Sequence, residues 1–312
     1  MDRLDAAALV WTGLCVLGFA VAPRAPEVPA VRPDEIAVMD ASAQAAAERA
    51  RTWMREHGDV VLPWEEAEGH MAIVVDDVGR DLHAFEALAG LRLRLTFNVL
   101  PGAPYALGVQ QRLRTDDRRP REVWLHLPME PHRSELMEEG PEAAEAFLRL
   151  ADDPKTLREK VEAALARVPL AVGVGHHMGS AFSERPDLLE HALAPICERG
   201  LAYLDSRTSP ASRAEDVARR LGCVVARRDV FLDDAKDEAS VARALGEAVR
   251  LARIRPVVVV AHPLPATIRV LRRAERTLAE EGIGVYPLSE VISHLRAPRP
   301  TTPNGSADGP PN

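Results

Sequence analysis

The sequence predicts an α/β fold built on a parallel sheet, and three observations support this prediction. Short apolar runs alternate with helix-like stretches seven or eight times between residues 71 and 295. Several runs are continuous and β-branched, such as 72–75 (AIVV) and 257–261 (VVVVA), as expected for strands buried on both faces. No dinucleotide-binding fingerprint or P-loop follows the first run. The alternation alone fits either a barrel or a doubly wound sheet.

The expected strands and helices follow from the spacing of apolar residues. The strands are Met71–Val75, Leu93–Val99, Glu122–Leu127, Ala171–Val174, Leu201–Leu204, Cys223–Ala226, Val257–Ala261 and Gly284–Leu288. The helices are Pro154–Arg167, Asp187–Glu198, Glu238–Ile254 and Ala266–Glu280, in which apolar residues recur at helical spacing. This order of elements predicts a parallel sheet covered by helices.

An apolar leader lies near the N-terminus. Ala6–Ala22 carries no charge, and a Pro-rich stretch follows it as far as Pro33. The run is shorter than the roughly 20 residues that span a bilayer, and Ala20–Ala22 resembles a signal-peptide cleavage site. We therefore expect residues 1–22 to be a cleaved signal peptide or an uncleaved N-terminal anchor. The protein would then be exported, and either periplasmic or anchored to the inner membrane facing the periplasm.

Composition predicts the remaining organisation. Residues 23–65 are expected to form a linker with one short helix at 41–56, and residues 297–312, rich in Pro, Gly and Ser, a disordered tail. The net charge of −8 argues against nucleic acid as a partner, because phosphate binding needs a basic face. Cys197 and Cys223 are expected to be buried thiols, with a disulfide as the alternative in an oxidising compartment.

Polar residues follow the expected strands at their carboxyl ends. In parallel α/β folds these ends meet at one face, which carries the active site. The residues that this rule brings together are Asp76, Asp77, His126, His176, His177, Asp205, Arg228, Asp229, Asp233, Asp234 and His262. His176 and His177 are adjacent, and neighbouring side chains of an extended strand point to opposite faces, so only one of the two should reach the site.

This set of residue types predicts metal-assisted hydrolysis. Two neutral imidazoles and one carboxylate can hold Zn²⁺ or a similar ion and leave one position open for water. A carboxylate just outside the ligand set can act as base, and a further histidine can act as acid.

Each residue also has a purely structural interpretation. Asp76 or Asp77 could cap the helix that follows Gly79. Asp205 and Asp229 could simply pair with neighbouring arginines. Three histidines that each lie beside an apolar strand are harder to explain in this way, so we favour a functional site.

Seven motifs occur in a distinctive order: AIVVDDVG (72–79), LTFNVLP (95–101), EVWLHLPMEP (122–131), HHMGS (176–180), YLDSRTS (203–209), RRDVFLD (227–233) and AHPLPAT (261–267). With them, the chain resembles the divergent polysaccharide deacetylase family, a branch of the polysaccharide deacetylase superfamily. The resemblance implies an irregular (β/α)7 barrel with parallel strands over residues 66–296. It also implies hydrolysis of N- or O-acetyl groups on sugars.

The resemblance implies a role for each site residue. Asp76 would be the catalytic base and His262 the acid that protonates the leaving group. One divalent metal ion, for which zinc is expected, would be held by Asp77, His126 and His177. The residues expected to bind the substrate or to support the site are Asp205, Arg228 and Asp229.

The chain departs from the superfamily at one ligand. Superfamily members typically carry both metal histidines in one H-x-x-x-H segment, whereas His126 and His177 are about 50 residues apart. His132 and His176 therefore stay open as alternatives for the third ligand.

We expect a metal-dependent hydrolase that removes acetyl groups from an envelope polysaccharide or oligosaccharide. Its partner would be the acetylated carbohydrate, with membrane contact only through the N-terminal segment if that segment is uncleaved. One alternative is a non-catalytic envelope protein that binds glycan or a protein partner through the barrel pocket. Another is a metal phosphoesterase, but two-metal phosphoesterases need more ligands than this set offers.

Overall fold

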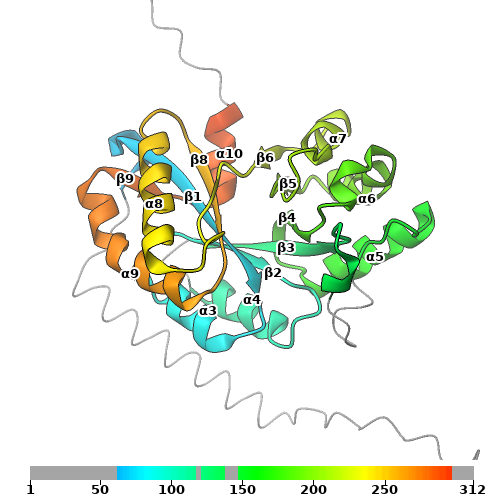
Figure 1. Cartoon of the computed structure of the whole chain (residues 1–312), viewed down its shortest axis with the longest axis horizontal. Coiled ribbons are helices and arrows are strands. Elements are labelled where there is room, and N and C mark those ends of the chain that lie inside the picture. The colour runs from blue at the N-terminus through cyan, green and yellow to red at the C-terminus, as the bar shows by residue number, and fades with distance from the viewer. Residues whose placement is uncertain (1–61, 117–120, 138–146, 297–312) are drawn as a thin grey trace, which may run out of the picture. The chain divides into compact units, whose positions relative to one another are not determined.

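The computed structural model describes residues 62–116, 121–137 and 147–296, which all belong to one structural unit (Figure 1). The expected leader at 1–22, the short helix at 41–56 and the tail at 297–312 lie outside the described residues. Within the described ranges, no helix has the length and apolar character needed to cross a membrane.

In the described part of the chain, nine strands form one parallel sheet. They are β1 (Gly69–Val78), β2 (Thr96–Val99), β3 (Glu122–Met129), β4 (Ala171–Met178), β5 (Ala202–Asp205), β6 (Val225–Arg227), β7 (Val230–Phe231), β8 (Val257–Ala261) and β9 (Ile283–Val285). Their order is β6-β5-β4-β3-β2-β1-β8-β7, and β9 pairs with the first residues of β1.

Helices connect the strands and cover the outside of the sheet. The described α-helices are α3 (Leu82–Ala89), α4 (Ala106–Arg114), α5 (Pro154–Arg167), α6 (Pro186–Glu198), α7 (Ala214–Arg220), α8 (Glu238–Ala252), α9 (Pro265–Glu280) and α10 (Leu288–Arg296), with 3-10 turns at Trp64–Glu66, Ser134–Leu136 and Phe182–Glu184. Aspartates cap three of them: Asp81, Asp153 and Asp237 accept backbone N–H bonds from the first turns of α3, α5 and α8.

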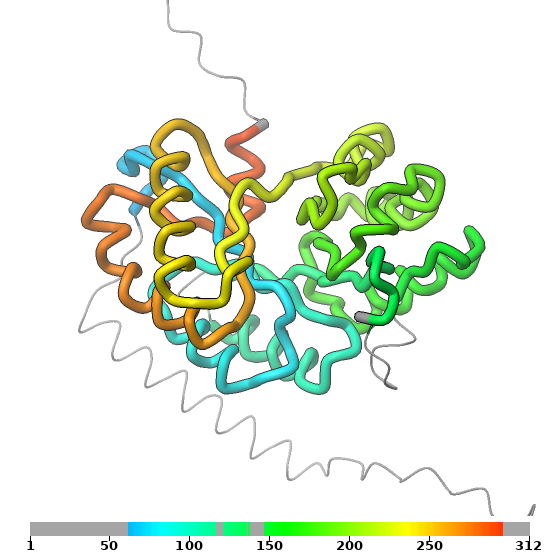
Figure 2. Tube along the Cα trace, in the orientation of Figure 1, coloured from blue at the N-terminus to red at the C-terminus, as the bar shows by residue number. Residues whose placement is uncertain are grey.

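The sheet closes into a barrel through a covalent crossing rather than through a ladder of hydrogen bonds. After β6, the Arg228 N–H donates to the Asp205 carbonyl, and the next N–H, that of Asp229, donates to the Val258 carbonyl. The chain thus passes from the β5 edge to the β8 edge, as the yellow-green trace in Figure 2 shows. β6 and β7 therefore share one position of the ring. With β1 to β5 and β8 this gives seven positions, which confirms the expected irregular (β/α)7 barrel.

Two apolar cores hold the barrel together. The larger core lies between the sheet and the surrounding helices. The smaller core fills the barrel interior, where Ala72, Val74, Trp124, Leu204, Val258 and Val260 pack against Leu288, Val291 and Ile292 of α10. The C-terminal helix thereby closes the barrel at the amino-terminal ends of the strands, and the opposite end is left for a site.

Several observed elements differ from the expected ones: the run Leu93–Val99 is a strand only from Thr96, the helix expected to end at Ile254 ends at Ala252, and two further differences lie at the C-terminal end and at β7. The run Gly284–Leu288 is a strand only as far as Val285, and α10 begins at Leu288. The apolar residues from Leu288 onward recur at helical spacing and face the barrel interior, so a helix buries them better than a strand would. β7 has only two residues, too few for a periodic signal in the sequence.

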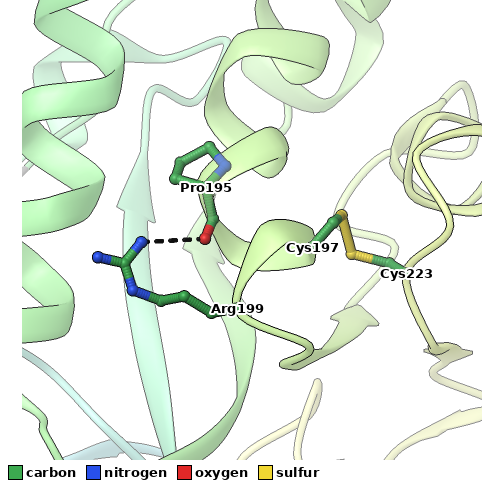
Figure 3. The surroundings of a disulfide bond; sticks show 4 residues. All are labelled: Pro195, Cys197, Arg199 and Cys223. Carbon is green, nitrogen blue, oxygen red and sulfur yellow. Dashed lines mark hydrogen bonds between the residues drawn. A yellow bond between two sulfur atoms is a disulfide. The ribbon is translucent and has the colours of Figure 1, made fainter.

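Cys197 and Cys223 form a disulfide, which corrects the expectation of two free thiols (Figure 3). Cys197 lies in the last turn of α6, and Cys223 lies just before β6. Because α6 packs against α7 and β5, and β5 pairs with β6, the two Cα atoms come within 4.8 Å. Next to the bond, the Arg199 side chain donates to the Pro195 carbonyl at 3.1 Å.

Candidate metal centre

The candidate site continues the inward-facing rows of the barrel at the carboxyl ends of the strands. Side chains alternate along a strand, so every second residue shares a face. On β1, Ala72 and Val74 belong to the interior core, and Asp76 is the next residue of that row. On β3, Trp124 is followed in the same way by His126. In each row the side chains are therefore apolar near the end that α10 closes and polar toward the carboxyl ends of the strands.

Two glycines set the inward row of β4. A Cβ at Gly173 would lie 2.5 Å from the Trp124 ring, and one at Gly175 would lie 2.6 Å from the Asn98 amide nitrogen. Inward side chains of β3 and β2 occupy this space, so only glycine fits. The next residue of the row is His177, which therefore faces the barrel interior.

A bulge brings two consecutive carboxylates to one site. The register between β1 and β2 shifts between Val75 and Val78, and Asp77 has a φ of 58°. This left-handed conformation is uncommon for residues other than glycine, although aspartate tolerates it better than most. It interrupts the strand alternation, so the Asp77 side chain reaches the same side of the strand as Asp76.

Asp77, His126 and His177 converge on a common point. The Asp77 Oδ1 atom lies 2.8 Å from His177 Nδ1 and 3.2 Å from His126 Nε2. Their potential ligand atoms all lie within 4.8 Å of one another. Both imidazoles are buried, with 1% and 7% of their surface exposed. Three donors on three strands thus face one another in a low-dielectric environment.

The contacts of Asp77 fit a bound cation better than a hydrogen-bond network. Despite its short distances to both imidazoles, Oδ1 of Asp77 is a buried oxygen without a hydrogen-bond partner in the described structure. Buried polar groups without partners are costly, and a carboxylate with two imidazoles is a donor set that Zn²⁺ and related ions accept. Burial alone would raise the pKa of Asp77, but the contacts and charge of the two histidines outweigh it and hold that pKa far below its usual value.

Asp76 lies beside this group without joining it. The Asn98 side-chain amide donates to Asp76 Oδ1 at 2.6 Å, and Asp76 Oδ2 lies 3.8 Å from His126 Nε2. Asp76 is 3% exposed and Asn98 is fully buried. One carboxylate oxygen is therefore held by Asn98, and the other lies toward the ligand group.

His262 approaches the same group from β8. Its Nδ1 atom lies 3.0 Å from Asp233 Oδ1, and its backbone N–H donates to Asp233 Oδ2 at 2.7 Å. Thr267 Oγ1 donates to the same Oδ2 atom at 2.7 Å. With Nδ1 held in this way, Nε2 faces the site and lies 4.0 Å from Asp77 Oδ2.

The charges around His262 favour its protonated form. Burial alone would lower its pKa, but the hydrogen bond to Asp233 and the negative charges of Asp76, Asp77 and Asp233 outweigh burial and raise the pKa of His262 to about 9. A protonated imidazole can donate a proton to a leaving group. His262 and Asp77 both line a pocket of about 480 Å³, whose wall also includes Arg80, Phe231, Asp234, Lys236 and Leu264.

The two alternative ligands lie elsewhere. His176 faces the outer core, where its Nδ1 atom lies 2.9 Å from the Tyr203 hydroxyl, and it is 1% exposed. Burial is the main cause of its lowered pKa, which keeps the imidazole neutral. His132 is at the surface, with its Nε2 atom 3.0 Å from Glu184 Oε1. The geometry thus selects His177 from the adjacent pair.

Comparison with known proteins identifies the family of this chain. The sequence profile of the divergent polysaccharide deacetylase family matches residues 73–292. The chain belongs to this family. It is 32% identical to a protein from Haemophilus influenzae over 69% of this chain and 74% of that one. It is 29% identical to the Escherichia coli protein YibQ over 78% of this chain and 74% of that one. Both relatives are described as uncharacterized proteins.

A solved structure of an uncharacterized protein from Agrobacterium tumefaciens has the same fold as this divergent polysaccharide deacetylase family member. The two share 25% of their residues, with a TM-score of 0.66 over 74% of this chain and 93% of that chain.

Asp205 and Arg228 shape the loops around the mouth of the site in this family member. The Asp205 carboxylate accepts hydrogen bonds from the Arg207 backbone N–H and the Ser212 hydroxyl, both at 2.8 Å. The Arg228 side chain donates to the Ser206 and Arg207 carbonyls and lies 5.0 Å above the centre of the Phe231 ring. The described side-chain contacts of both residues are therefore with the loops that follow β5 and with Phe231.

The structure does not bring Asp229 to the metal group. Its carboxylate accepts hydrogen bonds from Arg255 Nη2 at 2.8 Å and from the Val258 backbone N–H at 2.9 Å. Val258 lies near the start of β8, so Asp229 lies toward the amino-terminal ends of the strands. The crossing after β6 moves the chain away from the site before β7 returns to it.

Asn98, Asp233 and Thr267 are site residues to which the sequence interpretation gave no role. Asn98 stands at the carboxyl end of β2, so the strand-end rule would have found it. Asp233 follows β7 in the RRDVFLD motif, but that strand is too short to be recognised by periodicity. Thr267 lies inside α9, and nothing in the sequence connects it to Asp233.

Proposed function

We propose that this family member is a metal-dependent carbohydrate deacetylase that acts on an acetylated polysaccharide or oligosaccharide of the cell envelope. The observation that carries the proposal is the convergence of three features: the donor set of Asp77, His126 and His177, a second carboxylate beside it, and a histidine held by a carboxylate next to it. Few reactions need all three. Hydrolysis of an acetamide or acetyl ester needs a base, an electrophilic centre and an acid.

The candidate ligands would be Asp77, His126 and His177. A divalent ion held there would polarise the acetyl carbonyl and lower the pKa of a bound water. Asp76, with one oxygen fixed by Asn98, accepts the proton of the attacking water. Its ionised form is the competent one, because only a carboxylate can take the proton.

His262 completes the reaction. Its Nε2 proton passes to the departing nitrogen or oxygen of the sugar as the bond to the acetyl carbon breaks. Asp233 keeps that proton on Nε2 by holding Nδ1 and by stabilising the positive charge. Asp76 and His262 therefore act as separate base and acid, with their roles set by their different partners.

Two further observations support a location in the envelope. The uncharged run Ala6–Ala22 has the composition of a leader. The Cys197–Cys223 disulfide suits an oxidising compartment, because disulfides are rare in the reducing cytosol. We infer that the protein is exported and meets its substrate outside the inner membrane.

The proposal can be tested by measuring metal content and acetate release together. Wild-type protein should contain about one divalent ion per chain and release acetate from N-acetylglucosamine oligomers or O-acetylated glycans. Asp77→Asn should lose the metal. Asp76→Asn should keep the metal and lose at least about 100-fold in turnover, the usual scale of general-base catalysis.

Each outcome has a clear meaning. Metal binding without acetate release from any acetylated glycan would favour the alternative of a glycan-binding protein. If the wild-type protein bound no zinc, manganese or cobalt, the metal-dependent hydrolase mechanism would be wrong. Full activity in Asp76→Asn would show that another group is the base.

A further inference from the structure

His176 is a buried histidine that the proposed chemistry does not use. It directly precedes the candidate ligand His177 on β4, but its side chain faces the outer core and it is 1% exposed. A buried imidazole needs partners for its ring nitrogens. Its Nδ1 atom lies 2.9 Å from the Tyr203 hydroxyl, and its Nε2 atom makes a long contact of 3.5 Å with Thr208 Oγ1. These contacts link the end of β4 to β5 and to the loop that follows β5.

The hydroxyl of Thr208 fixes the direction of both contacts. Thr208 Oγ1 donates its proton to the Met178 carbonyl at 2.7 Å, and a carbonyl can only accept. The same oxygen can therefore only accept from His176, so Nε2 of His176 carries the ring proton. In a neutral imidazole the other nitrogen, Nδ1, then has no proton and accepts from the Tyr203 hydroxyl. The bonds thus run in one direction, from Tyr203 to the Met178 carbonyl.

This chain of hydrogen bonds ends on the peptide unit between Met178 and Gly179. Thr208 binds the carbonyl of this peptide, and the N–H of the same peptide donates to the Met129 carbonyl of β3 at 2.9 Å. The ring of His176 also packs on this turn, because a Cβ at Gly179 would lie 3.1 Å from His176 Cδ2. Both ends of the peptide plane are therefore held, one from the side of β5 and the other from β3.

The backbone at this turn needs such support. Met178 has a φ of 56°, in the left-handed region that residues other than glycine rarely adopt. A conformation of this kind persists only where the surrounding contacts determine it. Because Met178 directly follows His177, the direction in which β4 ends sets the position of the His177 imidazole. That imidazole lies 2.8 Å from Asp77 Oδ1, so a small shift of the strand end would disturb the candidate donor set.

We propose that His176 is a positioning residue for the candidate metal centre. Through Thr208 it holds the Met178–Gly179 peptide, and the end of β4 then presents His177 to the site. The two adjacent histidines thus have different roles, because His177 is the ligand and His176 supports it from the opposite face of the strand. This inference rests on the proposed function, and it adds a residue that acts on the metal centre without reaching it.

The first test measures amide hydrogen exchange in the metal-free full chain with isotope-labelled glycine. Thr208→Val removes the hydroxyl and nearly keeps the size of the side chain. It should speed exchange of the Gly179 amide several-fold, because the peptide is then held at one end only. Thr208→Ser keeps the hydroxyl and should exchange as the wild type does.

Thr277→Val is the matched control for this substitution. The Thr277 hydroxyl also donates to a carbonyl, that of Arg273, at 3.2 Å. It lies near the end of α9, which leads into β9 at the start of β1, so it is at the opposite end of the barrel from the candidate metal centre. Thr277→Val should leave the exchange of Gly179 unchanged.

The second test measures zinc affinity by competition with a chelator. Thr208→Val should bind zinc about tenfold more weakly than the wild type, the lower end of the usual effect of residues that orient a ligand, with little change in the urea midpoint. Thr208→Ser and Thr277→Val should bind zinc as the wild type does. Tyr203→Phe removes the first bond of the chain and should have a smaller effect in both tests. Combined with Thr208→Val, it should add almost nothing, because both changes act through His176.

The outcomes separate this inference from the proposed function. A wild-type exchange rate of Gly179 in Thr208→Val would overturn the inference, and so would an unchanged zinc affinity. Additive losses in the double variant would also overturn it, because His176 would then not connect Tyr203 to Thr208. If the wild-type protein bound no zinc, the proposed function would be wrong. The exchange rates of the metal-free variants would then still decide whether His176 and Thr208 hold the end of β4.

Discussion

At the amino-terminal end of the barrel, the inward rows carry Ala72, Val74 and Val260, which pack against α10. At the carboxyl-terminal end, the same rows carry Asp76, His126 and His262. The first set leaves no polar side chain to satisfy. The second holds charged groups in a buried space, where at least Asp77 Oδ1 has no hydrogen-bond partner among the described residues.

This difference separates stability from function within one continuous structure. Apolar burial stabilises the fold in proportion to the area removed from water. Buried polar groups without partners lower stability, so their retention at one end indicates a chemical role there. Changes at the amino-terminal end should therefore affect folding, and changes at the carboxyl-terminal end should affect chemistry.

The largest effect is expected from Trp124→Ala, inside the barrel. Trp124 is fully buried and fills the space over Gly173, so its truncation leaves a cavity and should lower the free energy of unfolding by about 4 kcal/mol. Urea unfolding of metal-free protein measures this. His177→Ala, at the other end, should stay within about 1 kcal/mol of the wild type. If both variants lose the same stability, the contrast between the two ends is wrong.

The disulfide should give the next largest effect, again on stability. Cys197 and Cys223 are separated by 26 residues in the sequence, and their disulfide lies near the amino-terminal ends of the barrel strands. In the chain-entropy model, removing the cross-link of such a loop lowers the free energy of unfolding by about 3.5 kcal/mol. The Cys197→Ala, Cys223→Ala double variant should unfold at correspondingly lower urea concentration. Reducing agent should destabilise the wild type and leave the variant unchanged. A variant as stable as the wild type would show that the bond does not constrain the fold.

Much of this architecture could be predicted from the sequence because burial leaves a periodic pattern. Continuous β-branched runs marked the strands, and their carboxyl ends marked Asp77, His126 and His262. The choice between His176 and His177 also had a signal. Gly173 and Gly175 occupy the inward row, because larger neighbours fill the barrel there, so His177 follows in the same row.

The parts that could not be predicted depend on contacts between distant segments. Asp229 follows a strand in the sequence, but the crossing from β6 to β7 turns it toward Arg255. The partnership of Asp233 with His262 joins residues 29 positions apart. The last expected strand ends at Val285, and α10 begins at Leu288 because this helix closes the barrel, which is a property of the whole fold rather than of the local sequence.

At the carboxyl-terminal end, Asp233→Asn should shift the pH dependence of turnover. In the folded protein the pKa of His262 is raised to about 9, from an ordinary value of 6.5, so the acid form is present below that pH and is lost as pH rises through it. Removing the carboxylate charge lowers this pKa. The alkaline limb of the pH–rate profile should therefore move to lower pH by about one unit or more.

A bound divalent ion offsets the charge of Asp77, so the wild-type limb is expected below pH 9 in the metal-loaded enzyme. The raised pKa of His262 also contributes to the free energy of unfolding, and this contribution decreases as pH rises. It is fully present below about pH 6.5, and it is lost as pH rises through the folded pKa. If the alkaline limb of the pH–rate profile did not shift in Asp233→Asn, and the metal content were unchanged, a group other than His262 would cause that limb.

The smallest effect is expected where a neighbour only orients the base. Asn98→Ala removes the hydrogen bond to Asp76 and should lower turnover about tenfold, with unchanged metal content and little change in the urea midpoint. Gly175→Ala should act in the same direction, because its Cβ would lie 2.6 Å from the Asn98 amide nitrogen and displace that side chain. Combined, the two changes should cost little more than either alone, since both act through one hydrogen bond. Additive losses would mean that Gly175 serves the site by another route, such as the placement of His177.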